Sequence, residues 1–129
     1  MEYIELVGAL AVLQFFFFGF MTGSARRKSG LKAPAVTGDA GFERMYRVQT
    51  NTLETLVAFL PALFIAGNHW PSALVSGIGV IYLVGRFIYW RAYISNSESR
   101  GLGFMLSILP TFVLIALAIL GPLISVANA

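Results

Sequence analysis

The sequence of Gly41–Pro61, GFERMYRVQTNTLETLVAFLP, places charged side chains at helical spacing immediately before an apolar run. Four of its polar residues follow one another at intervals of three, four and three: Arg44, Arg47, Asn51 and Glu54. These intervals put the four side chains on one stripe of a helix. Two arginines, an amide and a carboxylate are costly to expose to lipid. The stripe is therefore expected to face protein or a water-filled cavity and to carry a function.

The chain as a whole has the composition of a membrane protein. Of its 129 residues, 57% are hydrophobic and 12% are charged, whereas about a quarter of the residues of soluble domains are charged. Four stretches approach the roughly 20 apolar residues that cross a bilayer as a helix, at about 3–22, 43–66, 72–93 and 102–127. Short connections between them predict an all-α, integral-membrane, up-down four-helix bundle that forms a single transmembrane domain over residues 1–129.

The distribution of basic residues predicts which end of the bundle faces the cytoplasm. The connection 24–41 carries an excess of arginine and lysine, which favours the cytoplasmic side. The N-terminal segment has no basic residues before its apolar run, so we expect a retained span with its start on the opposite side. The apolar part of the second span, about Leu53 to Ala66, is too short to cross about 30 Å of hydrocarbon. Its helix is therefore expected to include the charged turns before Leu53.

Composition also excludes several kinds of chemistry. The chain has no cysteine, so any sulfur chemistry must use the thiol of a ligand. His69 has no second histidine near it, and we expect no metal site. The net charge of +3 comes from clustered basic residues rather than an extended basic surface, so we expect no nucleic-acid partner.

The end of the third span supplies a second set of polar residues on the same side. Arg86, Tyr89 and Tyr93 share one face of its helix, and each tyrosine hydroxyl needs a polar partner there. An ion pair between Arg47 and Glu54 is one interpretation of the first stripe, and the remaining arginine charge favours an anionic ligand with a carboxylate. Binding of lipid phosphate is the simpler interpretation for three cations: Lys28, Lys32 and Arg91.

Three blocks of this sequence resemble a known family. They are SARR at Ser24–Arg27, FERMYRVQTNTLE at Phe42–Glu54 and GRFIYWRAYISNSESR at Gly85–Arg100. They resemble the membrane-associated proteins in eicosanoid and glutathione metabolism, the MAPEG family, which includes leukotriene C4 synthases and microsomal glutathione transferases. The resemblance implies a homotrimer of four-helix subunits. It also implies that glutathione binds as co-substrate between neighbouring subunits at the cytoplasmic face.

The resemblance also implies roles for individual residues. The positions that match glutathione contacts within one subunit are Arg47, Asn51, Glu54, Arg86, Tyr89 and Tyr93. Arg26 and Gln49 match contacts from the neighbouring subunit. Arg100 matches the arginine that keeps the glutathione thiol ionised, and Arg27 matches one proposed to assist the electrophilic substrate. Because arginine keeps its proton, Arg27 is expected to act as an electrostatic stabiliser rather than as a general acid.

The sequence departs from the leukotriene synthase pattern at three positions. Thr55 stands where that enzyme has a tyrosine that contacts glutathione, and Ile88 and Ser95 stand where it has arginines. These departures argue against leukotriene synthesis and predict weaker glutathione binding. Arg47, by contrast, argues against the non-catalytic five-lipoxygenase-activating branch of the family, which departs at that position.

The function expected from these features is that of a membrane-bound glutathione transferase. Its other partners would be membrane lipids and lipophilic electrophiles from the bilayer, and glutathione peroxidase activity is an additional possibility. One alternative is a non-enzymatic, lipid-binding scaffold of the same family. Another is an isomerase that uses glutathione without consuming it. The short loops and the absence of a targeting tail favour a bacterial inner membrane over the endoplasmic reticulum.

Overall fold

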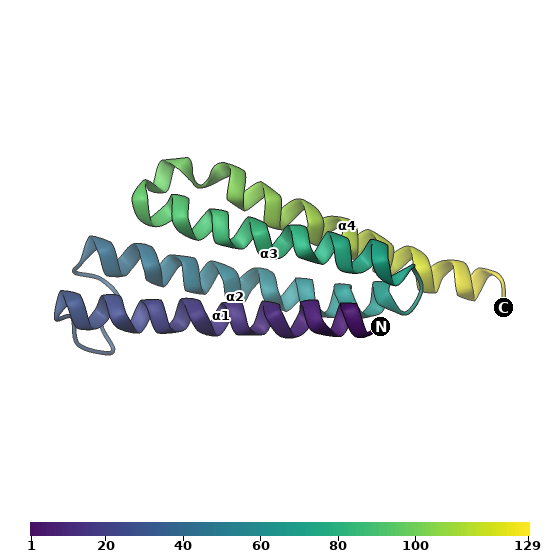
Figure 1. Ribbon diagram of the computed structural model, residues 1–129, viewed down its shortest axis with the longest axis horizontal. Helices are drawn as coiled ribbons and strands as arrows, with labels where there is room; N and C mark the ends of the chain where they lie inside the picture. Colours follow the sequence, from purple (N-terminus) through teal and green to yellow (C-terminus); the bar gives the residue numbers. More distant parts are fainter.

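A computed structural model describes the backbone of all 129 residues and the side chains of all but Ser97 and Glu98. Its elements are four long helices, α1 (Glu2–Ser29), α2 (Ala40–Gly67), α3 (Ser72–Ser95) and α4 (Gly101–Ala127), and a short 3-10 helix, η1 (Ser97–Arg100). The long helices run alternately in opposite directions in one bundle (Figure 1). All four are long and apolar enough to cross a membrane. The predicted four-helix, up-down membrane fold is confirmed.

Helix α1 extends further than the predicted span. It continues through Arg26 and Arg27 to Ser29, so the connection to α2 begins at Gly30 rather than at Ser24. Gly30 ends the helix in the left-handed conformation, with φ of 74°, and its N–H bonds to the carbonyls of Arg26 and Arg27. Charged residues mark where a span leaves the bilayer, and basic side chains suit the last turn of a helix. The helix therefore does not end where its apolar run ends.

Helix α2 includes the charged turns, as the sequence predicts. Its N-cap is Asp39, whose carboxylate accepts a hydrogen bond from the Phe42 N–H over 2.9 Å. The Glu43 carboxylate accepts another from the Gly38 N–H over 3.1 Å. These two bonds start the helix before the polar stripe, so Arg47, Asn51 and Glu54 all lie on one continuous helix.

Two close helix contacts set the position of α4 on α3. A Cβ added to Gly85 of α3 would lie 2.6 Å from the backbone carbonyl carbon of Leu106 in α4. A Cβ added to Gly103 of α4 would overlap the backbone of Tyr89 in α3. The absence of a side chain at both glycines lets the two backbones approach closely. Further along the bundle, stacked rings of Phe59 and Tyr82, 3.8 Å apart between centroids, join α2 to α3 in the main apolar core.

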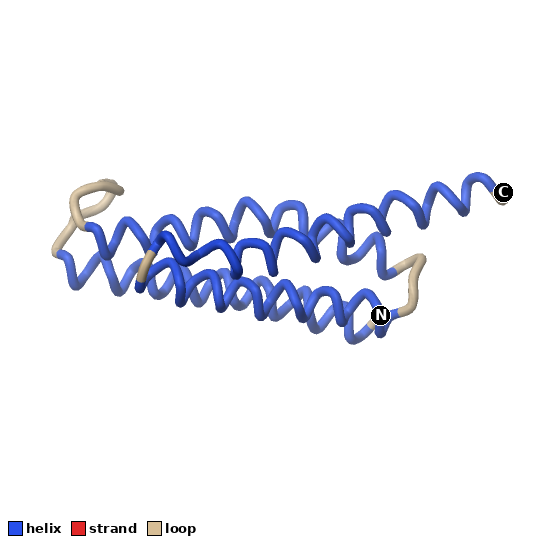
Figure 2. Tube along the Cα trace, turned by 90° about the horizontal axis from the view of Figure 1, so that it is seen from above, coloured by secondary structure: helices blue, strands red, loops and turns tan.

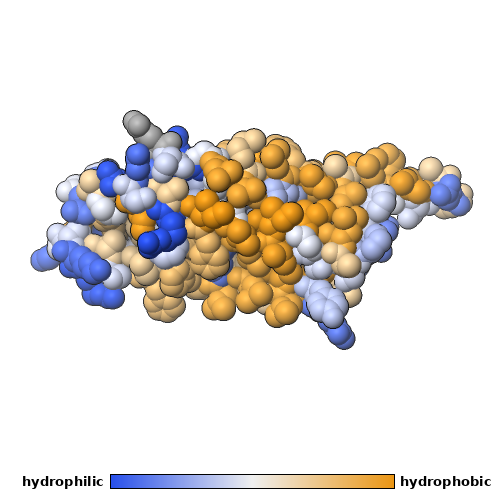
Figure 3. All heavy atoms as spheres, turned by 45° about the horizontal axis from the view of Figure 1, so that its top comes forward, coloured by the Kyte–Doolittle hydropathy of each residue, from blue (hydrophilic) through white to orange (hydrophobic). Residues whose placement is uncertain are grey.

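The surface of the bundle matches a bilayer. Hydrophobic side chains cover the middle of the face seen in Figure 3, and hydrophilic side chains gather at one end. We call that end the polar end. It contains the α1–α2 connection and the turn between α3 and α4. The loops lie at the two ends of the bundle (Figures 1 and 2). Large apolar side chains such as Phe20, Val57 and Phe112 are exposed. Exposed apolar surface on every helix suits contact with lipid.

Candidate functional site

A pocket lies at the polar end between α2, α3 and the start of α4, and we call it the polar pocket. Its volume is about 230 Å³, and it is lined by Arg47, Thr50, Asn51, Glu54, Tyr89, Tyr93 and Arg100. An adjoining pocket of about 400 Å³ shares Asn51, Tyr89 and Arg100 with it and adds Gly101 and Phe104. The turn η1 brings Arg100 back onto the tyrosines of α3. Three separate segments of the sequence, 47–54, 89–93 and 100–104, thus converge on one site.

The polar pocket combines positive charge with a single carboxylate. Arg47 and Arg100 supply two cations, Glu54 supplies the carboxylate, and Arg100 lies 5.8 Å from the centre of the Tyr93 ring. The ion pair between Arg47 and Glu54, one interpretation of the stripe, is not present among the described side chains, although both residues line the pocket. They are two helical turns apart, about 10 Å along the axis. Their charges are therefore directed at separate parts of the pocket.

Arg86 lies behind the polar pocket rather than in its wall. Its side chain is 0% exposed. It donates one hydrogen bond to Asn51 Oδ1 over 2.8 Å and another to Ser107 Oγ over 3.2 Å. Its guanidinium carbon lies 4.3 Å from the centre of the Tyr89 ring. Arg86 thus shares a helix face with Tyr89, as predicted, but neither pocket has it among its lining residues.

Three predicted site residues lie outside the pocket of this chain. Arg26 donates a hydrogen bond to the Ala35 carbonyl over 2.7 Å and lies 4.4 Å from the centre of the Phe42 ring. Arg27 is exposed on the last turn of α1. Gln49 lies on the side of α2 that meets α1, close to Gly19. Their assignment to the site of a neighbouring subunit stays a prediction.

The structure adds residues that the sequence interpretation did not name. Thr50 lines the polar pocket. It lies three residues after Arg47 on the same stripe, so helical spacing could have predicted it. Ser107, which binds Arg86, follows Gly103 by one helical turn in a helix that carries no charge. Thr55, which the resemblance aligns with a tyrosine of leukotriene synthase, does not line the pocket: its hydroxyl and that of Tyr82 are 3.3 Å apart in the bundle interior.

The chemistry of the polar pocket favours a ligand with both signs of charge. Arginines bind carboxylates with charge-assisted hydrogen bonds, and Glu54 offers the matching acceptor for an ammonium group. Asn51 and the tyrosine hydroxyls add neutral partners for amide groups. The open side of the bundle beside the pocket is apolar, with Leu102 and Met105 exposed on α4. A water-soluble zwitterion and a lipophilic molecule can therefore meet at this site.

Comparisons with known proteins find a family model and relatives that match nearly the whole chain. The model of the MAPEG family matches residues 4–120. The chain is 37% identical over 115 residues to the Synechocystis sp. protein named "Uncharacterized protein sll1147", covering 89% of this chain and 84% of that protein. It is 34% identical over 126 residues to human microsomal glutathione S-transferase 2, covering 98% and 83%. Bovine leukotriene C4 synthase is 34% identical over 115 residues, covering 89% and 77%.

Proposed function

The chain belongs to the MAPEG family, and from that premise we propose that it is a membrane-bound glutathione transferase. It joins the sulfur of glutathione to lipophilic electrophiles that reach the polar end through the bilayer. The names of two relatives, a glutathione S-transferase and leukotriene C4 synthase, support this class of activity. The observation that carries the proposal is the convergence of predicted glutathione contacts on one pocket: Arg47, Asn51, Glu54, Tyr89, Tyr93 and Arg100.

The charges of the pocket fit those of glutathione. Glutathione carries two carboxylates and one ammonium group. Arg47 is placed to hold a carboxylate, and Glu54 is placed to hold the ammonium group. The hydroxyl groups of Tyr89 and Tyr93 and the Asn51 amide remain for its peptide groups. In this assignment Arg100, which lines both pockets, lies beside the thiol and the adjoining space receives the electrophile.

Arg100 would activate the thiol by stabilising its ionised form. A free thiol has a pKa near 8.5 and is only a few per cent ionised at about pH 7. Lowering that pKa by about two units requires about 2.7 kcal/mol of preferential stabilisation of the thiolate, which an adjacent guanidinium can supply. The thiol proton leaves to solvent and the thiolate attacks the electrophilic carbon. A carbon–sulfur bond forms, and the leaving group departs with the electron pair of the bond that breaks.

The remaining predicted residues act across a subunit boundary in this proposal. The protein forms a homotrimer in the membrane, and Arg26 and Gln49 of one subunit reach the pocket of the next. Arg27 of the same neighbour stabilises negative charge that develops on the electrophile. This arrangement is supported by the position of all three residues outside the pocket of their own chain. The polar end faces the cytoplasm, where glutathione is available.

Binding and product analysis test the proposal directly. The purified protein in detergent is titrated with glutathione by calorimetry and then incubated with glutathione and a lipophilic aryl halide. We expect saturable binding and a glutathione S-conjugate. Absence of binding by the intact assembly would overturn the proposal in favour of the lipid-binding scaffold. Rearrangement of a lipid endoperoxide without loss of glutathione, with no conjugate formed, would favour the isomerase.

A pair of arginines on one helix provides the matched control. Arg44→Ala and Arg47→Ala each remove one exposed arginine from the first turns of α2, and only Arg47 lines the polar pocket. We expect Arg47→Ala to weaken glutathione binding by about tenfold or more, the effect of losing a hydrogen bond to a charged group. Arg44→Ala is expected to bind as the wild type does. Equal losses in both variants would indicate a general effect of surface charge instead of a contact at the site.

A further inference from the structure

Arg86 is a buried cation with only neutral partners among the described side chains. It is 0% exposed within α3, and it donates hydrogen bonds to the Asn51 amide oxygen and to the Ser107 hydroxyl. Its Nε–H group is also buried, and it has no hydrogen-bond partner in the described part of the chain. Burial of a charge without a carboxylate is unfavourable for the fold. A role in stability alone therefore does not account well for an arginine at this position.

The bond from Arg86 fixes the orientation of the Asn51 side chain. The guanidinium has only N–H donors, so it must face the carbonyl oxygen of the Asn51 amide, at 2.8 Å. The NH₂ group on the same carbon is then turned away from Arg86. Asn51 also lines the polar pocket and the adjoining pocket. Its NH₂ group is thereby offered as a donor to whatever the pocket holds.

The second bond of Arg86 fixes the guanidinium itself. The Ser107 hydroxyl lies within 3.0 Å of the Gly103 carbonyl and 2.9 Å of the Phe104 carbonyl, both of which can only accept. The hydroxyl proton is therefore used within α4, and the oxygen is left to accept from Arg86 at 3.2 Å. Arg86 thus connects its own helix to α2 through Asn51 and to α4 through Ser107. A shorter or more mobile cation could not hold both contacts in one geometry.

We propose that Arg86 is a positioning residue for ligand binding, which presents the Asn51 NH₂ group to the ligand without touching the ligand itself. This role differs from the direct glutathione contact that the family resemblance implies for Arg86, and it rests on the proposed function only in taking glutathione as the ligand. It assigns a use to the buried charge: an acceptor at this position would bind the Asn51 NH₂ group and turn the Asn51 oxygen to the pocket. An arginine, which only donates, excludes that orientation.

A double-mutant cycle on glutathione affinity tests the proposal. The dissociation constant is measured by calorimetry for the wild type, Arg86→Gln, Asn51→Ala and the double variant. We expect each single variant to bind about tenfold more weakly, as for loss of one hydrogen bond to the ligand. The double variant should bind within about threefold of Asn51→Ala, because Arg86 acts through Asn51. Losses that multiply to about a hundredfold would show an independent ligand contact by Arg86 and would overturn the proposal.

Arg86→Lys separates positioning from charge. Lysine keeps the positive charge but presents a single ammonium group, which cannot bond to Asn51 and Ser107 in the geometry of the guanidinium fork. We expect Arg86→Lys to bind glutathione nearly as weakly as Arg86→Gln. Full recovery of affinity by lysine would mean that only the charge matters, and the positioning role would then be wrong.

Thermal unfolding without glutathione tests the Arg86–Asn51 contact on its own. Asn51→Asp keeps an oxygen toward Arg86 and adds a charge pair, whereas Asn51→Ala removes the acceptor. We expect the Tm of Asn51→Asp to equal or exceed that of the wild type and the Tm of Asn51→Ala to fall. The reverse order would overturn the contact and the proposal. Because no glutathione is present, this result does not depend on the proposed function, whose own failure would appear as absence of binding by the wild type.

Discussion

Gly103 of α4 packs so closely on Tyr89 of α3 that a Cβ on the glycine would overlap the tyrosine backbone. Gly103 follows Arg100 by three residues, so the contact also sets where Arg100 lies relative to Tyr89 in the pocket wall. The site therefore depends on two glycine contacts, at Gly85 and Gly103, that contain no functional group. Packing between α3 and α4 determines the geometry of the polar pocket.

Gly103→Ala should damage both the fold and the pocket. The added methyl group must displace backbone, which is costly because the neighbouring atoms of Tyr89 cannot rotate away. We expect a loss of about 1–3 kcal/mol in the free energy of unfolding, the usual effect of overpacking, and weaker glutathione binding. Thermal unfolding and calorimetry measure the two effects. Gly77→Ala is the matched control, since a Cβ there meets nothing within 4 Å; an equal decrease in Tm would contradict the packing argument.

Arg100→Ala should change the ionisation of bound glutathione more than its affinity. Thiolate forms as pH rises through the thiol pKa, so a pKa lowered to about 6.5 keeps most of the bound thiol ionised at about pH 7. In the variant we expect the ultraviolet absorbance of the thiolate to appear only near pH 8.5, where a free thiol titrates. Conjugation should fall more than tenfold at about pH 7 and recover as pH rises.

Arg91→Ala is the control for that experiment. Arg91 is an exposed arginine near the end of α3, 5.3 Å from the centre of the Trp90 ring, and it lines neither site pocket. Its removal lowers the positive charge of the polar end by the same amount. We expect an unchanged titration midpoint. A midpoint that stays the same in Arg100→Ala as well would remove Arg100 from the activation of the thiol.

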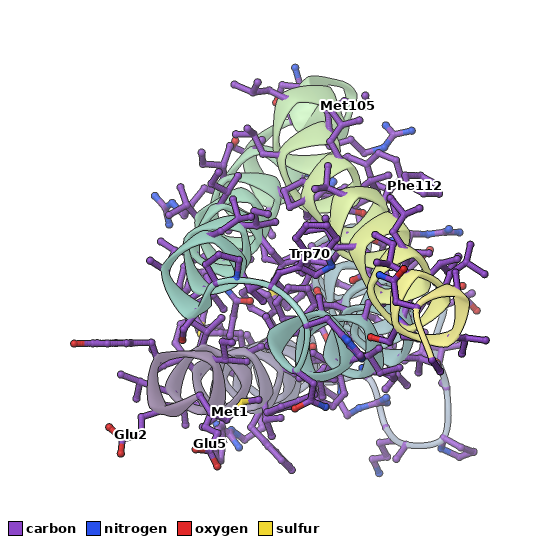
Figure 4. All side chains as sticks on the ribbon, turned by 90° about the vertical axis from the view of Figure 1, so that its right-hand side faces the viewer. Met1, Glu2, Glu5, Trp70, Met105 and Phe112 are labelled. Atoms are coloured by element: carbon purple, nitrogen blue, oxygen red, sulfur yellow. The ribbon has the colours of Figure 1, made fainter. Side chains whose placement is uncertain are left out.

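Glu54→Gln should weaken glutathione binding through its ammonium group specifically. Replacement of a charged acceptor typically costs about 1.5–3 kcal/mol, which corresponds to about tenfold to a hundredfold in affinity. An analogue of glutathione without the amino group should lose far less affinity on the same substitution. Glu5→Gln is the control, because Glu5 points outward at the opposite end of the bundle (Figure 4). If both ligands lose affinity equally, Glu54 does not hold the ammonium group.

Much of this architecture follows from sequence patterns because helical spacing reports direction. The spacing of Arg47, Asn51 and Glu54 predicts a shared face, and all three line one pocket. Arg44 fits the same stripe but lies outside the pocket. The pocket forms only along the part of α2 that faces residues of α3 and Arg100. Where α3 and α4 reach α2 depends on Gly85 and Gly103. Spacing within one helix contains no information about that contact.

Depth within the bundle is the second quantity that the sequence did not provide. Arg86 and Tyr89 are three residues apart on one face, yet only Tyr89 lines the pocket. Periodicity gives the direction of a side chain but not the layer of the protein in which its end lies. Thr55 is a different case: it lies one residue after Glu54, so it points to another side of α2, where its hydroxyl lies 3.3 Å from that of Tyr82. The contacts proposed from a neighbouring subunit cannot be predicted from the periodicity of one chain.

Trp70→Phe should lower stability without affecting the site. The Trp70 Nε1–H donates to the Leu117 carbonyl of α4 over 2.9 Å, and Figure 4 shows its side chain inside the bundle, at the end opposite the polar pocket. Trp90→Phe is the matched control, because the Trp90 Nε1–H is buried without a partner in the described structure. We expect Trp70→Phe to cost about 1 kcal/mol more in the free energy of unfolding. We also expect Trp70→Phe to bind glutathione as the wild type does. Equal stability of Trp70→Phe and Trp90→Phe would contradict the prediction.

Mixing of subunits should show whether the pocket is shared between chains. Asn51→Ala damages the part of a site that its own chain supplies, whereas Gln49→Ala damages the part proposed for the neighbour. In a cyclic assembly of the two variants, random pairing leaves roughly a quarter of the sites intact. We therefore expect calorimetry of the mixture to recover high-affinity binding at about that fraction. Asn51→Ala mixed with Glu54→Gln damages the same part of every site, so no recovery is expected from it. Equal recovery in both mixtures, or none in either, would contradict a site completed by Gln49 of a neighbouring subunit.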